Sequence, residues 1–124
     1  MTTIHGRIHE GNKDFTKRMT AFSAVFAKTV GEELFPGTLN VQIDEQIKIR
    51  EHFRIPGAEI DEPEQDLLFE ICRVNSHWAY RVRPLNRADG SGGHGDHILE
   101  IVCSIQLRKE RGFDDSDIRV VFFR

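Results

Sequence analysis

The chain has 124 residues, of which 39% are hydrophobic and 30% are charged; this is typical of a folded globular protein and excludes a disordered chain. A formal net charge of −3 argues against a nucleic-acid-binding protein, which would carry a broad basic face. A chain of this length is expected to form a single domain over residues 1–124. No apolar run is long enough to span a membrane. Cys72 and Cys103 lie in apolar runs and are expected to be core residues of a reduced, cytoplasmic protein.

The first predicted elements are a strand and a polar turn. Residues 2–9 place two isoleucines among polar side chains and predict a strand that ends at Gly11. Residues 12–17 are polar and basic, so we expect a turn there. The backbone N–H groups of such a turn, together with the ammonium group of Lys13, suit a phosphate. A solvated turn without a ligand is the alternative interpretation.

Residues 18–30 predict one amphipathic helix. Apolar side chains recur at spacings of three and four residues, alanines fill the positions between them, and Gly31 is suited to end the helix. Phe22 and Phe26 lie one turn apart and are expected to pack into the core.

The stretch after this helix combines a turn with an alternating strand. Pro36 sets φ for the first central position of a turn, and Gly37 accepts a positive φ at the second. Over residues 38–43 the apolar side chains fall on one face, and Thr38 and Asn40 fall on the other. A hydroxyl and an amide oxygen side by side suit Mg²⁺, which prefers hard oxygen ligands. The alternative is a polar outer face of a half-buried strand.

The C-terminal half predicts four strands, over residues 67–74, 78–82, 97–105 and 118–123. The loop over residues 84–96 is rich in glycine but lacks the Gly-Lys-Ser/Thr ending of a phosphate loop. The third of these strands is almost continuously apolar, which indicates burial on both faces. Glu100 lies inside it, and a carboxylate there is either held in a structural salt bridge or engaged by a ligand.

Two blocks of the sequence carry a resemblance to a known family. Residues 35–40 (Phe-Pro-Gly-Thr-Leu-Asn) resemble the Pro-Gly-Thr-Leu-Asn signature of the archaeal CTP-dependent riboflavin kinases. Residues 98–102, followed by Leu107-Arg108 and the turn at 112–117, are similar to the closing segment of that family. The resemblance covers most of the chain and implies a mainly β fold, a six-stranded cradle-loop β-barrel with one main helix, as in these riboflavin kinases.

The resemblance also implies an activity and a set of site residues. The activity is phosphoryl transfer from CTP to riboflavin, which gives FMN, with Mg²⁺ as cofactor. Thr38 and Asn40 match the magnesium-binding pair. Glu100 matches a flavin contact and would orient or deprotonate the attacking hydroxyl, while His94 stands at the place of a histidine in the flavin loop. The implied nucleotide-binding residues are Gly11, Asn12, Lys13, Gln106, Leu107, Arg108 and Lys109.

Three departures from the family pattern favour an alternative function. The phosphate loop keeps only Gly11 of its glycines, no threonine follows Thr38, and Ser116 replaces the glycine of an Asp-Gly-Asp turn. The alternative is a divergent or catalytically inactive barrel that binds a nucleotide or another small ligand without kinase turnover.

Two further hypotheses are disfavoured by the sequence. A DNA-binding relative of the same architecture would need a basic stripe that the net charge does not support. A zinc site at His94 and His97 with Glu100 is disfavoured because residues three apart on an extended chain point to opposite faces.

Overall fold

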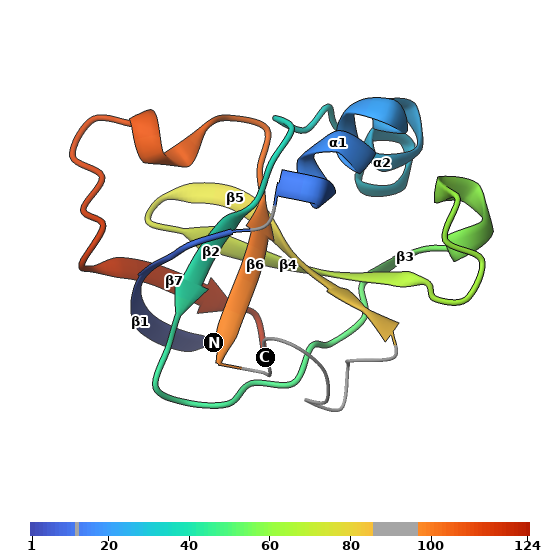
Figure 1. Ribbon diagram of the computed structural model, residues 1–124. Helices are drawn as coiled ribbons and strands as arrows, with labels where there is room; N and C mark the ends of the chain where they lie inside the picture. Colours follow the sequence, from blue (N-terminus) through green and yellow to red (C-terminus); the bar gives the residue numbers. More distant parts are fainter. Residues whose placement is uncertain (12, 86–96) are drawn as a thin grey trace.

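The computed structural model describes residues 1–11, 13–85 and 97–124, and these residues form seven β-strands and two α-helices (Figure 1). In chain order the elements are β1 (Thr2–His9), α1 (Lys13–Ala21), α2 (Ser23–Val30), β2 (Leu39–Gln42), β3 (Phe53–Ile55), β4 (Leu67–Val74), β5 (His77–Pro84), β6 (Ile98–Val102) and β7 (Ile118–Phe122), with short 3₁₀ helices η1 (Gly57–Ile60) and η3 (Leu107–Lys109). No helix among the described residues has both the length and the apolar character needed to cross a membrane.

Six of these strands close into an antiparallel barrel. The pairing runs β4-β5-β6-β2-β1-β7 and returns from β7 to β4, and β3 is added at the edge of β4. One edge of β4 serves both neighbours, because residues 67–69 pair with β3 and residues 72–74 pair with β7. The prediction of a mainly β, six-stranded barrel is therefore confirmed.

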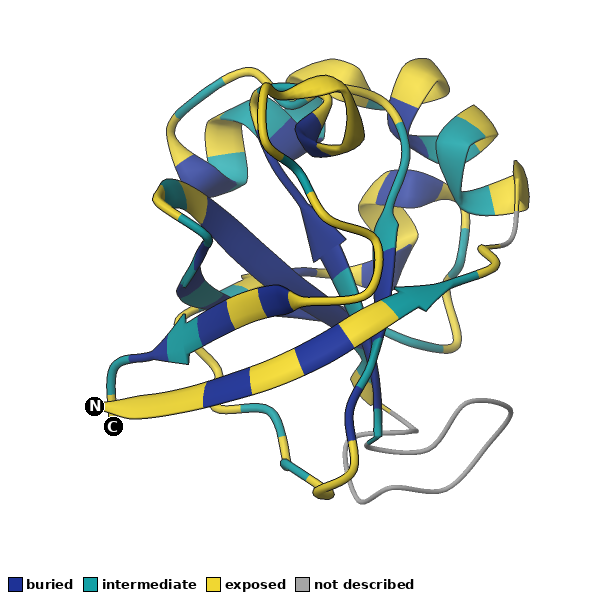
Figure 2. Ribbon diagram, turned by 90° about the vertical axis from the view of Figure 1, so that its left-hand side faces the viewer, coloured by how far each residue is buried: buried dark blue, intermediate teal, exposed yellow. Residues whose placement is uncertain are grey.

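Alternation along the strands fills the barrel with apolar side chains. Buried and exposed residues alternate along β1 and β7, as Figure 2 shows. On β2, Val41 and Ile43 lie in the interior cluster and Leu39 packs against it, as the alternation of residues 38–43 predicts. The interior therefore holds one face of β2, and the other face, which carries Asn40, points away from it.

The face of Asn40 lies on the outside of the barrel, where the two helices pack. Met19 and Phe26, from α1 and α2, form a second buried cluster with Phe69 and Val82 of the outer face of the sheet. The rings of Phe26 and Phe69 meet edge to face with centroids 6.0 Å apart. The helices therefore lie together against the outer face of the barrel (Figure 1).

The helical region differs from the prediction in two respects. It begins at Lys13, so the expected turn over residues 12–17 is helical from that residue onward. Phe15 extends the apolar stripe one turn earlier and packs edge to face on Phe26, and this tertiary contact favours helix over turn. The expected single helix is also divided at Phe22, whose φ of −118° and ψ of 33° break the helical path between α1 and α2.

A buried carboxylate lies at one end of the barrel. Glu70 of β4 is fully buried, and its two oxygens accept hydrogen bonds from the guanidinium of Arg124 at 2.6 and 2.9 Å. The backbone N–H of Arg50 donates to the same carboxylate at 2.9 Å. This charged pair ties the C-terminal residue and the loop after β2 to the sheet.

Candidate nucleotide site

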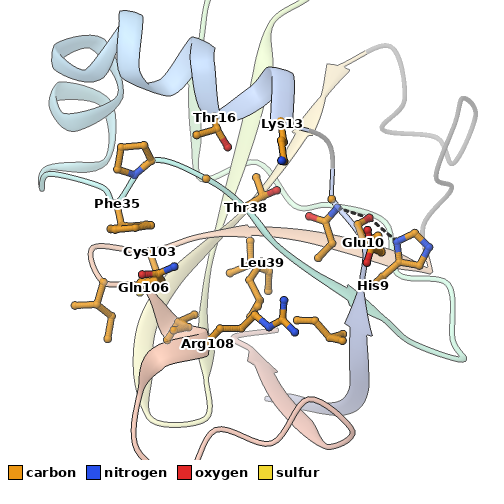
Figure 3. A pocket seen from close by; sticks show the side chains of 18 residues that line it. His9, Glu10, Lys13, Thr16, Phe35, Thr38, Leu39, Cys103, Gln106 and Arg108 are labelled. Atoms are coloured by element: carbon orange, nitrogen blue, oxygen red, sulfur yellow. Dashed lines mark hydrogen bonds between the residues drawn. The ribbon is translucent and has the colours of Figure 1, made fainter.

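A pocket of about 460 Å³ opens where the ends of several elements meet. It is lined by the end of β1, the start of α1, the bend before β2, and the segment that runs from β6 to Arg108 in η3. In Figure 3, Lys13 and Thr16 reach from α1 toward Thr38, and Arg108 lies on the other side of the pocket. Residues far apart in the sequence therefore share one cavity.

Gly11 brings the first strand against the Thr38 and Asn40 pair. His9 of β1 is paired with Asn40 of β2, so the chain that leaves β1 passes directly beside the start of β2. A Cβ on Gly11 would lie 3.2 Å from Asn40 Nδ2 and 3.6 Å from Thr38 Oγ1. The absence of a side chain at Gly11 therefore leaves room for Thr38 and Asn40, which both line the pocket.

The side-chain amide of Asn40 is buried, and its oxygen has no hydrogen-bond partner among the described residues. Asn40 is only 3% exposed, and its Nδ2 donates a long hydrogen bond of 3.4 Å to the carbonyl of Glu10. Among the described residues, Asn40 Oδ1 has no hydrogen-bond partner although it is buried. Such an atom is costly without a ligand. Amide and hydroxyl oxygens are hard donors, so the side chains of Asn40 and Thr38, which both line the pocket, fit Mg²⁺.

The bend at Pro36-Gly37 is held from two sides. Gly37 has φ of +130°, a conformation that favours glycine, and its N–H donates to Met19 Sδ of α1 at 3.3 Å. The N–H of Phe35 donates to the carbonyl of Cys103 at 2.8 Å. The bend that presents Thr38 is therefore fixed between α1 and the segment after β6.

Charges of both signs line the pocket. Lys13 and Arg108 contribute cations, and Glu10 contributes a carboxylate. Arg108 Nη2 donates to Asp115 Oδ2 at 2.6 Å, and this carboxylate, with a smaller effect from Glu10, raises the pKa of Arg108 above its ordinary value. The guanidinium is therefore charged and oriented at the pocket wall.

Glu100 lies next to this pocket rather than in its lining. It is the direct cross-strand partner of Asn40 in the β2–β6 ladder and is half buried. Directly opposed residues on antiparallel strands point to the same side, with Cβ atoms about 4.5–5.5 Å apart. Glu100 and Asn40 therefore share the outer face of the barrel.

Two comparisons with known proteins show the family to which the chain belongs. The model of the family CTP-dep_RFKase, described as Domain of unknown function DUF120, matches residues 8–121. The chain belongs to this family of CTP-dependent riboflavin kinases. It is also similar to a riboflavin kinase from Thermofilum pendens (strain DSM 2475 / Hrk 5), with 32% identity over an alignment of 108 residues, and the match covers 74% of this chain. The match covers 44% of the relative, so the chain spans less than half of that protein's length.

The remaining predicted site residues of this family member differ in their placement. Gln106 lines the pocket, whereas Lys109 is not among the lining residues. Leu107 also lines it, but its side chain is buried in the barrel cluster, so its backbone is what it can offer a ligand. Asn12 and His94 lie outside the described residues, and the zinc hypothesis depends on His94. Among the described residues, no three His, Cys, Asp or Glu side chains gather as a metal site.

Several pocket residues were missed by the sequence analysis. Thr16 was counted in a polar turn, but the early start of α1 turns it toward the pocket. Phe35 is 41% exposed on the pocket wall, and its position just before Pro36 was a signal that was not used. Cys103 is 5% exposed, and its Sγ donates to the carbonyl of Trp78 at 3.2 Å. Burial raises the pKa of the Cys103 thiol, so its role in the wall is packing.

Proposed function

We propose that this chain binds a nucleoside triphosphate, CTP, as its Mg²⁺ complex in the pocket and transfers the terminal phosphate to riboflavin, which gives FMN. The observation that carries the proposal is the close approach of Gly11 to the Thr38 hydroxyl and to the buried Asn40 amide, whose oxygen has no hydrogen-bond partner among the described residues. Family membership and the name of the Thermofilum pendens relative support the choice of donor and acceptor.

The phosphate end of the proposed site is the region around Gly11, Lys13 and Thr38. Thr38 and Asn40 would hold Mg²⁺, which, when bound, neutralises charge on the phosphate oxygens. Lys13 supplies a point charge, and it begins α1, whose first N–H groups and dipole favour an anion at that end. These groups supply the positioning and electrostatic stabilisation that phosphoryl transfer requires.

The acceptor end of the proposed site is beyond Asn40, on the side of Glu100. In the transfer, a hydroxyl oxygen of riboflavin forms a bond to the terminal phosphorus while the bond from that phosphorus to the bridging oxygen breaks, and the nucleoside diphosphate leaves. The proton of the hydroxyl must be removed, and the Glu100 carboxylate is our candidate base. Glu100 lies directly opposite Asn40 on the neighbouring strand, and this position supports the role.

A second candidate, nucleotide binding without turnover, is favoured by one feature of the chain. A helix begins at Lys13, two residues after Gly11, so the segment after β1 has little room for a longer glycine-rich loop. Fewer glycines mean fewer backbone N–H groups that can approach the phosphates closely. Binding is then expected to survive better than transition-state stabilisation.

The test is calorimetric titration with CTP, ATP and GTP in the presence of Mg²⁺, followed by a riboflavin phosphorylation assay that measures FMN. The variants are Thr38→Ala, Asn40→Ala and Glu100→Gln. Gln42→Ala is the matched control, because Gln42 has the same orientation on β2 but is not among the pocket-lining residues.

Three outcomes separate the hypotheses. Nucleotide binding that is lost in Thr38→Ala and Asn40→Ala, with FMN formation lost in Glu100→Gln, supports the kinase. Binding with the same dependence but no FMN selects the binding barrel. The absence of nucleotide binding by the unmodified chain refutes both.

A further inference from the structure

The pocket-lining cation Arg108 is held by a residue to which no role has been assigned. Its Nη2 donates to Asp115 Oδ2 at 2.6 Å. A guanidinium has five N–H donors in a planar fork, and this bond uses only one nitrogen, so Nε and Nη1 remain able to donate to a ligand. Arg108 can therefore contact Asp115 and a bound anion at the same time.

The turn that carries Asp115 is fixed by contacts of three neighbouring residues. Its carbonyl accepts the N–H of Ile8 at 2.8 Å, which ties the turn to the end of β1. The adjacent Asp114 accepts hydrogen bonds from the N–H and the hydroxyl of Ser116 at 2.9 and 2.7 Å. Phe113 packs against the interior cluster of the barrel. The carboxylate of Asp115 is therefore a fixed partner for a long and otherwise flexible side chain.

We propose that Asp115 is a positioning residue that holds the Arg108 guanidinium at the pocket wall, where it receives a phosphate group of the bound nucleotide. The inference rests on the proposed function and deepens it. Without the Asp115 carboxylate, nucleotide binding must restrict the rotamers of Arg108 at the moment of association. The function of the pair is thus to lower the entropic cost of binding an anion.

The exposure of the pair separates this role from a structural one. The side chains of Arg108 and Asp115 are 55% and 50% exposed, and exposed ion pairs contribute little to folding stability. Removal of the Asp115 charge should therefore leave the fold unchanged. Its effect should be seen only with ligands that carry phosphate.

The experiment compares binding of CTP with Mg²⁺ to binding of cytidine, which lacks phosphate, in the unmodified chain and in three variants. Asp115→Asn should weaken CTP binding roughly 3- to 10-fold, the range expected when one rotamer-rich side chain must be immobilised on binding, and should leave cytidine binding unchanged. Asp115→Glu should restore part of the affinity. Asp117→Asn is the matched control, since Asp117 belongs to the same turn but pairs with His5 at 2.8 Å instead of Arg108.

A double-mutant cycle with Arg108→Ala completes the test. If Asp115 acts through Arg108, then Asp115→Asn has no further effect in the Arg108→Ala background. Unchanged CTP affinity in Asp115→Asn, an increase in that affinity, or an equal loss for cytidine overturns the inference while nucleotide binding by the unmodified chain stands. Failure of the unmodified chain to bind any nucleotide overturns the proposed function and, with it, this inference.

Discussion

Replacement of Asn40 by alanine should remove binding without cost to the fold. Asn40 is 3% exposed, yet Asn40 Oδ1 has no partner among the described residues, and such an atom costs about 1–3 kcal/mol of desolvation. Asn40→Ala removes that cost. It also removes the bond of 3.4 Å from Nδ2 to the Glu10 carbonyl, which contributes at most about 1 kcal/mol.

The desolvation cost that is removed is at least as large as the hydrogen-bond contribution that is lost, and the space left by the side chain opens into the pocket instead of forming a sealed cavity. We therefore expect the free energy of unfolding of Asn40→Ala to lie between that of the unmodified chain and about 3 kcal/mol above it. Val41→Ala is the control, because Val41 is the next residue of β2, is fully buried in the barrel and should lose about 2–3 kcal/mol.

The assay is urea unfolding at 25 °C with and without CTP and Mg²⁺. A ligand at a concentration of 100 times its Kd stabilises the folded chain by about 2.7 kcal/mol, and this increment should persist in Val41→Ala and vanish in Asn40→Ala. A loss of more than about 2 kcal/mol in Asn40→Ala without ligand, a size typical of a buried structural group, would refute the reasoning.

Three other variants test separate parts of the structure. Gly11→Ala should weaken nucleotide binding roughly tenfold with little change in stability, because its Cβ would lie 3.2 Å from Nδ2 of Asn40 and would displace the amide whose oxygen is the proposed metal ligand; titration measures this. Tyr80→Phe should cost roughly 1.5 kcal/mol at pH 7, because the hydroxyl donates to Glu32 at 2.6 Å. Burial, and to a smaller extent the Glu32 carboxylate, raises the pKa of Tyr80. The contribution of the Tyr80 hydroxyl to stability is therefore complete below about pH 10 and is lost above it. In urea unfolding, the difference in stability between Tyr80→Phe and the unmodified chain should shrink as the pH rises through this range. Glu70→Gln should lower the free energy of unfolding by about 3–5 kcal/mol, since it breaks the buried pair with Arg124.

Gly31→Ala is the control variant for Gly11→Ala. Gly31→Ala should lose about 1 kcal/mol of stability without effect on binding, since Gly31 has φ of +88° and nothing lies near its Cβ position. Equal effects of Gly11→Ala and Gly31→Ala on binding would contradict the contact argument. A pH-independent difference for Tyr80→Phe, or a stability loss in Glu70→Gln no larger than that of an exposed pair, would contradict the other two.

The sequence by itself predicted the six strands of the barrel, though not β3, and the two-faced character of β2. Period-two alternation is a local property, because each side chain points opposite to its neighbour whatever the strand pairs with. Residues 2–9 and 67–74 therefore had the bounds of β1 and β4 before any pairing was known. The motif at residues 35–40 likewise indicated the family that the comparison then showed.

Only the tertiary structure decided where α1 begins and why Asn40 is buried. Residues 12–17 have little helical signal of their own, and packing of Phe15 on Phe26 extends the helix to Lys13. The alternation places Asn40 on the polar face of β2, yet its side chain is covered by Glu10 and Gly11. This happens because β1 pairs with β2, and the segment that leaves β1 passes over the Asn40 side chain. Such contacts join residues some thirty positions apart, and no local pattern encodes them.

Arg108 and Asp115 are only seven positions apart, yet the sequence did not predict their pairing either. A Leu-Arg sequence and an acidic turn were both visible in the chain, but their pairing at 2.6 Å depends on η3 and the turn before β7 lying together beside the end of β1. Barrel closure, which returns β7 to both β1 and β4, creates this neighbourhood. The chemistry of each side chain was thus given by the sequence, and its partner was given by the fold.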